Sequence, residues 1–219
     1  MWETVKLGEV CNFQNGFAFK SSLFKEDGKP ILRISNIQED KIDVKKLVYF
    51  SDDDYVEDFR RYRVEQGDLL IAMSGATTGK LGFNSTNQVF YLNQRVGKFT
   101  PKEKLNKKYL YYLLSTKVEE NLSISKGAAI PNLSTEQIKN IEFLMPPLAE
   151  QQRIVAKLDA AFAEIDEAIS FEIDKKRNVE RLIAKMLNSS FENISSENSK
   201  PLIKVAKFEN GDRGKKYPS

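Results

Sequence analysis

Short apolar runs separated by turn residues fill the first two thirds of the chain. Runs of β-branched and aromatic residues, broken about every ten residues by Gly, Pro, Asn or Asp, are typical of short strands. These runs predict strands at 30–34, 47–50, 68–73, 88–92 and 96–99. Glycines at 67, 75 and 79 mark the turns around the third of these strands.

Two stretches of the same part carry the 3.6-residue period of a helix. Between 103 and 122 the apolar residues recur at three- and four-residue intervals, which predicts an amphipathic helix. A shorter helix is predicted to begin at Ser134, because its hydroxyl and the side chain of Gln137 can form a capping box. Strands combined with such helices predict an α+β domain over residues 1–145.

A long helix is predicted to follow this domain. Pro146 and Pro147 end the mixed segment, since prolines cannot continue a ladder and the second suits a helix start. From 148 to about 191 there is neither proline nor glycine, which predicts one spacer helix of roughly 65 Å within residues 146–191. Its seven-residue apolar repeat predicts a coiled-coil interface formed by Leu148, Val155, Leu158, Phe162, Ile165, Ile169, Val179, Ile183 and Met186.

Two charged residues, Glu172 and Lys176, interrupt this apolar repeat and are spaced to pair with each other. A helix this long cannot bury its stripe against itself, so we expect a second long helix outside these residues. Residues 192–199 (ENISSENS) form a polar linker. Residues 204–211 (KVAKFENG) then repeat 9–16 (EVCNFQNG) with Val, Phe, Asn and Gly in register, so 192–219 are predicted to be a linker and the start of a second domain copy.

The composition suits a globular protein, with 41% hydrophobic and 30% charged residues. No apolar run reaches the ~18–20 residues that a bilayer crossing needs, and the first residues do not form a signal peptide. We therefore expect a cytoplasmic protein. The net charge of +3 is too small to indicate nucleic acid by itself.

The chain contains no histidine, and Cys11 is its single cysteine. Ser-His-Asp and Cys-His nucleophile systems, HExxH zinc sites and thiolate zinc clusters are thereby excluded within one chain. Asp52, Asp53 and Asp54 are interpreted as a solvated turn at a helix start and not as a metal site. We predict no catalytic residue and no metal site.

Several motifs resemble those of type I restriction-modification specificity subunits. They are 66–82 (QGDLLIAMSGATTGKLG), 92–96 (LNQRV), 126–134 (KGAAIPNLS) and 141–155 (IEFLMPPLAEQQRIV), and 211–219 (GDRGKKYPS) is similar to the start of a second recognition domain. The resemblance covers essentially the whole chain.

The resemblance implies a non-catalytic subunit that recognises double-stranded DNA. Members of the family carry two recognition domains joined by two long helices in an antiparallel coiled coil; each domain reads half of a bipartite target. S-adenosylmethionine and ATP are expected on the modification and restriction subunits, and no cofactor is expected in this chain. With one domain and one long helix, the chain is either a fragment or a half-subunit that forms a homodimer through the helix. A protein that uses the same fold for interaction or inhibition, without reading DNA, is the alternative.

The candidate DNA contacts are basic, amide and hydroxyl side chains near the predicted turns: Lys20, Arg33, Arg60, Arg61, Arg63, Ser74, Thr77, Thr78, Lys80, Asn93, Gln94, Arg95 and Lys126. Residues 75–80 (GATTGK) do not fit a nucleotide-binding P-loop, because three residues separate the glycines and Leu81 follows the lysine. That turn meets DNA phosphates or is purely structural.

Two further candidates leave alternatives open. Residues 60–63 (RRYR) are either a DNA backbone contact or a solvated helix end. Arg95, beside Asn93 and Gln94, has the side-chain chemistry of a base reader. However, a motif shared by proteins that read different sequences suits a scaffold or a phosphate contact better.

Overall fold

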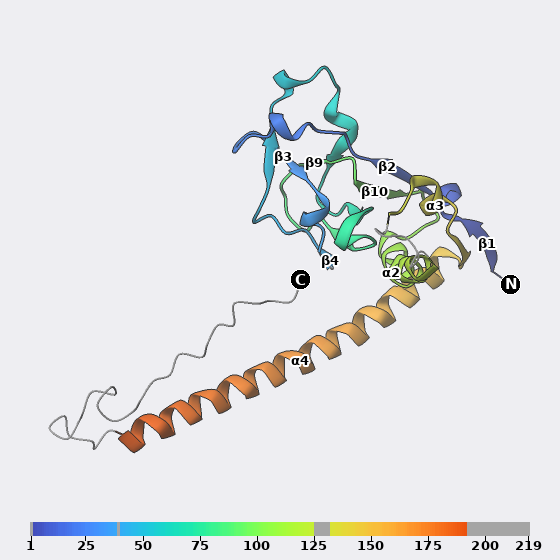
Figure 1. Cartoon of the computed structure of the whole chain (residues 1–219). Coiled ribbons are helices and arrows are strands. Elements are labelled where there is room, and N and C mark those ends of the chain that lie inside the picture. The colour runs from blue at the N-terminus through green and yellow to red at the C-terminus, as the bar shows by residue number, and fades with distance from the viewer. Residues whose placement is uncertain (1, 39, 125–131, 192–219) are drawn as a thin grey trace, which may run out of the picture. The chain divides into compact units, whose positions relative to one another are not determined.

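The computed structural model describes residues 2–38, 40–124 and 132–191, and it has the predicted α+β composition (Figure 1). The chain divides into two compact units, Met1–Ala160 and Ala161–Ser219. The long helix α4, Leu148–Phe191, begins in the first unit and ends in the second. This confirms the predicted long helix, whereas the functional division at residue 145 stays a prediction.

The five predicted strands are all present, with shifts of one or two residues at their ends, as β3, β5, β7, β9 and β10. The strands of the described residues are β1 (Glu3–Lys6), β2 (Cys11–Asn15), β3 (Lys29–Leu32), β4 (Asp40–Lys41), β5 (Val48–Phe50), β6 (Arg63–Val64), β7 (Leu69–Ala72), β8 (Leu81–Phe83), β9 (Phe90–Leu92), β10 (Val96–Pro101) and β11 (Glu142–Met145). The α-helices are α1 (Leu7–Val10), α2 (Lys107–Ile124), α3 (Thr135–Lys139) and α4; the short 3₁₀ helices are η1 (Ser21–Leu23), η2 (Ile34–Asn36), η3 (Asp52–Asp54), η4 (Phe59–Tyr62) and η5 (Gly75–Thr77).

The strands form three sheets. A five-stranded sheet has the order β2-β10-β7-β8-β4, a four-stranded sheet has the order β5-β3-β9-β6, and β1 pairs with β11. Strands β9 and β10 follow each other in sequence but belong to different sheets, so the turn between them joins the two. The β1–β11 pair, in which Val5 lies opposite Phe143, brings the start of the chain beside the strand that precedes α4 (Figure 1).

Strand β7 separates two hydrophobic cores. Its four residues are fully buried, and they alternate between the cores because successive side chains of a strand point to opposite faces. Leu69 and Ile71 join the core formed with α2 and α3, whereas Leu70 and Ala72 join the core of the four-stranded sheet. A strand covered on both faces accounts for the uninterrupted apolar run in the sequence.

The core of the four-stranded sheet is aromatic. Phe50, at the end of β5, lies 4.6 Å from the rings of both Phe19 and Phe59 and 5.2 Å from Tyr91, measured between centroids. Tilted and edge-to-face contacts of this kind add to the stability that burial alone provides. This core supports η4 and the ends of β3 and β9.

The helices α2 and α3 cover the other core. The predicted capping box is confirmed: the Gln137 amide donates to Ser134 Oγ at 3.1 Å, and the Ser134 amide donates to Gln137 Oε1 at 2.9 Å. Four of the predicted apolar positions of α2 and the preceding turn are buried: Leu105, Tyr109, Leu110 and Leu114. Leu113 packs against the core while partly buried, and the predicted position Val118 lies outside the residues whose side chains the structure describes.

The first turns of α4 pack against the domain. Gln151 is fully buried, and its side chain donates to the carbonyl oxygens of Lys104 and Pro146 at 2.9 and 2.8 Å while accepting from the Asn106 amide at 2.8 Å. Asp159 accepts from Lys108 at 2.7 Å, and this hydrogen bond holds the pKa of its carboxyl below the ordinary value. These contacts fix the start of α4 to the start of α2.

From Phe162 onward the apolar side chains of α4 are exposed. Between 48% and 53% of the surface of Phe162, Ile165, Ile169, Val179 and Ile183 is accessible. Val155, by contrast, packs against the first core. Within the described helices, no stretch combines the length and the apolar character that a membrane crossing needs.

Candidate nucleic-acid interface

The loop after β7 is a tight turn built by two glycines and two hydroxyl groups. Gly75 and Gly79 have φ angles of 77° and 86°, a region that glycine occupies without steric cost. Thr78 Oγ1 donates to the Gly75 carbonyl at 2.6 Å, and Thr77 Oγ1 donates to the Ile34 carbonyl at 3.1 Å. The turn that these glycines predicted after the third strand is therefore present. Both hydroxyl groups stabilise the turn.

The turn between β9 and β10 presents the amide and guanidinium candidates. The Val96 amide donates to the Asn93 carbonyl at 2.8 Å, which closes the turn, and the Asn93 amide donates to the Leu32 carbonyl at 3.0 Å. Gln94 and Arg95 are exposed, whereas Asn93 is half-buried. The two exposed side chains are thus held on a short turn whose backbone is fixed on both sides.

Backbone hydrogen bonds join the two turns. The Met73 amide donates to the Arg95 carbonyl at 2.9 Å, and the Leu133 amide donates to the Met73 carbonyl at 2.8 Å. Ser74 pairs with Asn132 as an isolated bridge, and Arg95 Nη1 donates to Asn132 Oδ1 at 3.1 Å. We call residues 74–80, 93–95 and Asn132 the two-turn surface.

Arg33 lies next to this surface at the end of β3. Ile34, which follows it, contacts the 75–80 turn through Thr77 and lies close to Gly75. The Arg33 amide donates to the side chain of the buried Asn36 at 3.0 Å, and Arg33 Nη2 donates to the Lys46 carbonyl at 3.4 Å. The structure therefore brings Arg33, Ser74, Thr77, Thr78, Lys80, Asn93, Gln94 and Arg95 into one region.

Asn15 and Gly16 support this region, and sequence analysis did not select them. A Cβ atom on Gly16 would lie 2.2 Å from the Asn93 carbonyl oxygen, so only glycine allows β2 to approach the turn. Asn15 Nδ2 donates to Thr135 Oγ1 at 2.7 Å. The signal was present, because both residues belong to the segment that 204–211 repeats.

Residues 1–175 match the family described as "Type I restriction modification DNA specificity domain". The chain belongs to this family. The predicted resemblance to type I specificity subunits is therefore confirmed, and the match includes all of the first compact unit, Met1–Ala160.

Two curated relatives are specificity subunits of type I restriction enzymes. The chain is 32% identical over 194 residues to the MjaVIII specificity subunit of Methanocaldococcus jannaschii, covering 85% of this chain and 44% of the relative. It is 32% identical over 171 residues to the EcoBI specificity subunit of Escherichia coli, covering 75% of this chain and 33% of the relative. The chain thus spans less than half of their lengths.

Solved structures share the fold. The HsdS subunit from Thermoanaerobacter tengcongensis superimposes with a TM-score of 0.64 at 22% identity, over 88% of this chain and 45% of that one. A chain from a structural study of complex assembly and conformational transition of the type I R-M system gives a TM-score of 0.69 at 22% identity, over 87% and 45%. The predicted α+β fold with a long helix is confirmed, whereas a partner for that helix is not shown.

The basic cluster of the specificity domain, residues 60–63, is matched by acids. Arg60 Nη2 lies 2.7 Å from Asp58, Arg61 lies 3.2 Å from Glu57, and Arg63 lies 3.1 Å from Glu65. The hydrogen bond from Arg60 lowers the pKa of Asp58 to about 2. Each guanidinium is therefore offset locally, which weakens the attraction of this cluster for phosphate.

Arg95 differs from this cluster, because the group to which its guanidinium donates is the neutral amide of Asn132. Its positive charge stays uncompensated by that bond. Lys20, at the start of η1, is exposed and lies away from the two-turn surface in sequence; its amide donates to Tyr55 Oη at 3.1 Å. The remaining candidate, Lys126, lies outside the described residues.

The acidic run 52–54 forms the short helix η3, as the sequence analysis predicted for a solvated turn. Ser51 caps it by accepting from the Asp53 amide at 3.4 Å. Asp52 pairs with Lys29, and Asp54 lies 2.8 Å from Lys25. These carboxylates pair with lysines beside the antiparallel β3–β5 pair.

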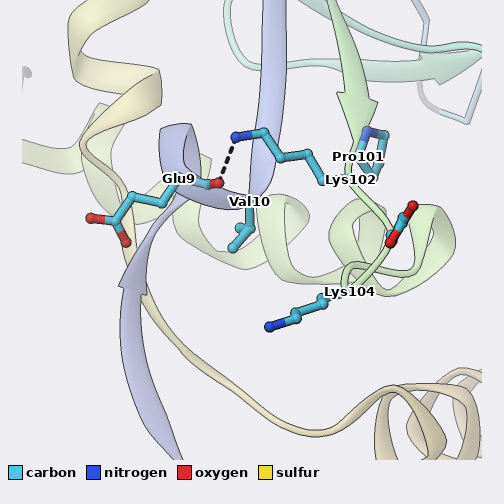
Figure 2. Close-up of a pocket in the computed structure, with 6 residues that line it drawn as sticks. Glu9, Val10, Pro101, Lys102 and Lys104 are labelled. Atoms are coloured by element: carbon cyan, nitrogen blue, oxygen red, sulfur yellow. Dashed lines mark hydrogen bonds between the residues drawn. The ribbon is translucent and has the colours of Figure 1, made fainter.

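A pocket of about 570 Å³ lies at the end of β10, away from every predicted site residue (Figure 2). It is lined by Glu9, Val10, Pro101, Lys102, Glu103 and Lys104. Lys102 Nζ donates to the Glu9 carbonyl at 2.7 Å, which ties the end of β10 back to α1. Its lining offers two acids and two lysines whose opposite charges favour no single ligand class.

Proposed function

We propose that this chain is the DNA-recognition part of a type I restriction-modification system and that its two-turn surface contacts duplex DNA. One observation carries the proposal: backbone hydrogen bonds hold Arg95 and Gln94 beside the 75–80 turn in one rigid region. The Arg95 guanidinium donates there to the neutral side-chain amide of Asn132. Rigid presentation of a guanidinium that forms no ion pair with an acid of the described residues, beside hydroxyl and amide groups, suits contact with phosphate. The family assignment supports DNA as the ligand.

In this proposal, each recognition domain reads one half of a bipartite DNA target. A second domain would be supplied by a second copy of the chain, joined through α4, or by a longer protein. A spacer helix of roughly 65 Å compares with ~34 Å for each turn of DNA, so two domains would be about two turns apart. Modification subunits that bind S-adenosylmethionine, and restriction subunits that use ATP, would dock on this assembly in the cytoplasm.

The test of DNA contact measures binding of the full chain to a mixed-sequence duplex by fluorescence anisotropy at several salt concentrations. We expect the logarithm of the binding constant to fall linearly with the logarithm of salt concentration, because lysines and arginines release condensed counterions. Arg95→Ala should weaken binding and reduce the slope by about 0.9. Arg60→Ala is the matched control, because Asp58 already offsets that charge, and it should leave the slope unchanged.

The outcome also separates the alternatives. Equal weakening on every duplex by Arg95→Ala indicates a phosphate contact, whereas relaxed sequence preference indicates base reading. If the chain binds no duplex in a salt-dependent way, alone or with a modification subunit, the DNA-recognition proposal is wrong and an interaction or inhibitor protein is favoured.

A further inference from the structure

The exposed apolar stripe of α4 is arranged symmetrically about residue 174. Its members are Phe162, Ile165, Ile169, Val179, Ile183 and Met186, each 48% to 68% exposed. Glu172 and Lys176 occupy the two heptad positions between Ile169 and Val179. The positions on the two sides of residue 174 are therefore mirror images in spacing.

We propose that α4 pairs with α4 of a second copy in one antiparallel register, centred on residue 174 and fixed by two reciprocal Glu172–Lys176 ion pairs. This inference rests on the proposed function in one respect, which is that a second copy of the chain is the partner of α4. In this register Ile169 meets Val179 of the other copy, Ile165 meets Ile183, and Phe162 meets Met186. Each of these layers is filled by two apolar side chains, as a coiled-coil interface requires, and the next heptad position beyond them places Leu158 opposite Ser190.

The charges exclude the neighbouring arrangements. A shift by one heptad in either direction places Glu172 and Lys176 opposite apolar side chains, which leaves charges without partners in the interface. A parallel pair places Glu172 opposite Glu172 and Lys176 opposite Lys176, so like charges would meet twice. A polar position inside a coiled-coil seam specifies register in this way.

The contact that Glu172 makes within its own chain does not prevent it from pairing with Lys176 of a second copy. Sequence analysis expected Glu172 to pair with Lys176, whereas the structure pairs it with Lys175 at 3.5 Å, with both side chains more than 60% exposed. Exposed pairs of this kind contribute little. Glu172 can therefore exchange this neighbour for Lys176 of the second copy.

The ends of α4 agree with the register. Phe191, the last residue of α4, falls opposite residue 157 of the second copy. Residues before that point face their own domain, because Gln151 is buried there and Ile154 and Val155 pack on its core. The paired segment would therefore begin where packing on the domain ends, and the two helix starts would lie roughly 78 Å apart along the axis.

Cysteine pairing in the full chain tests the register. Ile169→Cys and Val179→Cys chains, co-expressed with different affinity tags, should form a mixed disulfide under mild oxidation. Each variant alone should form none, because two copies of residue 169, or of residue 179, would lie roughly 15 Å apart along the axis, beyond the reach of a disulfide. The native Cys11 is 2% exposed and should not react.

Charge exchange provides the second test, with dimer dissociation measured by analytical ultracentrifugation. Glu172→Lys should raise the dissociation constant at least about tenfold, and adding Lys176→Glu in the same chain should bring it back to within about threefold of the original. Glu167→Lys, the same substitution on the outer face of the pair, is the control and should have little effect.

The outcomes are distinguishable. A dimer in which each cysteine variant cross-links with itself is parallel and overturns the register, and so does a dimer that forms no mixed disulfide; the proposed homodimer then stands. A chain that remains monomeric overturns the second copy as the partner. Neither result affects the DNA contact, which is measured separately by the salt dependence of duplex binding.

Discussion

Gly16 lies where the chain leaving β2 passes closest to the turn between β9 and β10. Its amide donates to the Val96 carbonyl at 3.1 Å, and a Cβ atom would lie 2.2 and 2.3 Å from the carbonyl oxygens of Asn93 and Leu92. Those neighbours are backbone atoms that cannot rotate away. The position of the 93–95 turn therefore requires glycine, which has no Cβ atom, at residue 16.

We predict that Gly16→Ala destabilises the domain by roughly 3 kcal/mol, because backbone atoms must shift to admit the methyl group. Urea denaturation of the full chain, followed by circular dichroism, measures the change. Gly67→Ala is the control, since Gly67 has a positive φ of 80° and open space around it, so that it should cost only about 1–2 kcal/mol. Equal losses for both variants would show that the close approach is unimportant.

The residues of the repeated segment have specific roles in the first copy. The Phe13 ring lies 4.9 Å from the Phe99 ring, measured between centroids, in a tilted contact. Asn15 donates a hydrogen bond to Thr135, and Gly16 leaves room for the turn. Their types recur at 208, 210 and 211, which lie outside the described residues. The second copy stays a prediction, but the recurring types are those that the first copy needs.

The arginine candidates show which side-chain partners can be predicted from the sequence. The acids that offset Arg60, Arg61 and Arg63 lie within four residues of them in sequence, so the pairing could have been predicted. The partner of Arg95 is Asn132, which is 37 residues away, and only the fold brings the two together.

At the scale of single elements, Gln151 is the residue that joins α4 to the rest of the domain. Its side chain makes three hydrogen bonds to backbone groups of Lys104, Asn106 and Pro146. Gln151 belongs to the 141–155 motif, but nothing in the sequence of that motif predicted its role. A buried amide whose two donors and whose oxygen are all bonded is costly to replace, because its partners would lose their hydrogen bonds without gaining water.

We predict that Gln151→Leu destabilises the domain by about 3 kcal/mol, since two carbonyl groups and one amide lose their partners in a buried site. Gln152→Leu, at the exposed neighbouring position, should change the stability by less than about 0.5 kcal/mol. Guanidinium chloride denaturation compares the two variants. A difference smaller than 1 kcal/mol between them would contradict the role given to Gln151.

Strands that lie within an apolar run could be predicted, and the five found are of this kind. Strands β2 (five residues, CNFQN) and β8 (three residues) were missed, as were β4 and β6, which contain two residues each, too few to show a period. Strands β1 and β11 were also missed. Their pattern has one buried residue among four in each strand, and their pairing joins residues more than 130 positions apart.

For the whole molecule, the exposed apolar residues of α4 are the main feature that a single chain leaves unexplained. Besides the predicted interface, Phe171, Ile173, Leu182, Leu187 and Phe191 are 53% to 68% exposed. Exposed apolar surface of this extent marks an interaction site in a protein of this size. The proposed self-pairing accounts for the heptad positions and brings Ile173 next to the twofold axis.

We predict that replacing both Phe162 and Ile169 with Glu abolishes self-association, because four unpaired carboxylates would enter the interface. Light scattering should give the mass of one 25.1 kDa chain for the variant and twice that mass for the original. Both residues lie beyond Ala160, the end of the first unit, so thermal unfolding of the domain should be unchanged. An unchanged mass would contradict the proposed interface.

The sequence by itself determined the α+β class, the five strands that lie in apolar runs, the capping box at Ser134, the extent of α4 and the family. Each of these is encoded in local period, turn chemistry or contiguous motifs. The tertiary structure decided which candidates meet. It joined the 75–80 and 93–95 turns, supplied Asn132 to Arg95 and neutralised the 60–63 cluster. The physical reason is that contacts between distant segments depend on how strands are ordered in the sheets, and no local pattern records that order.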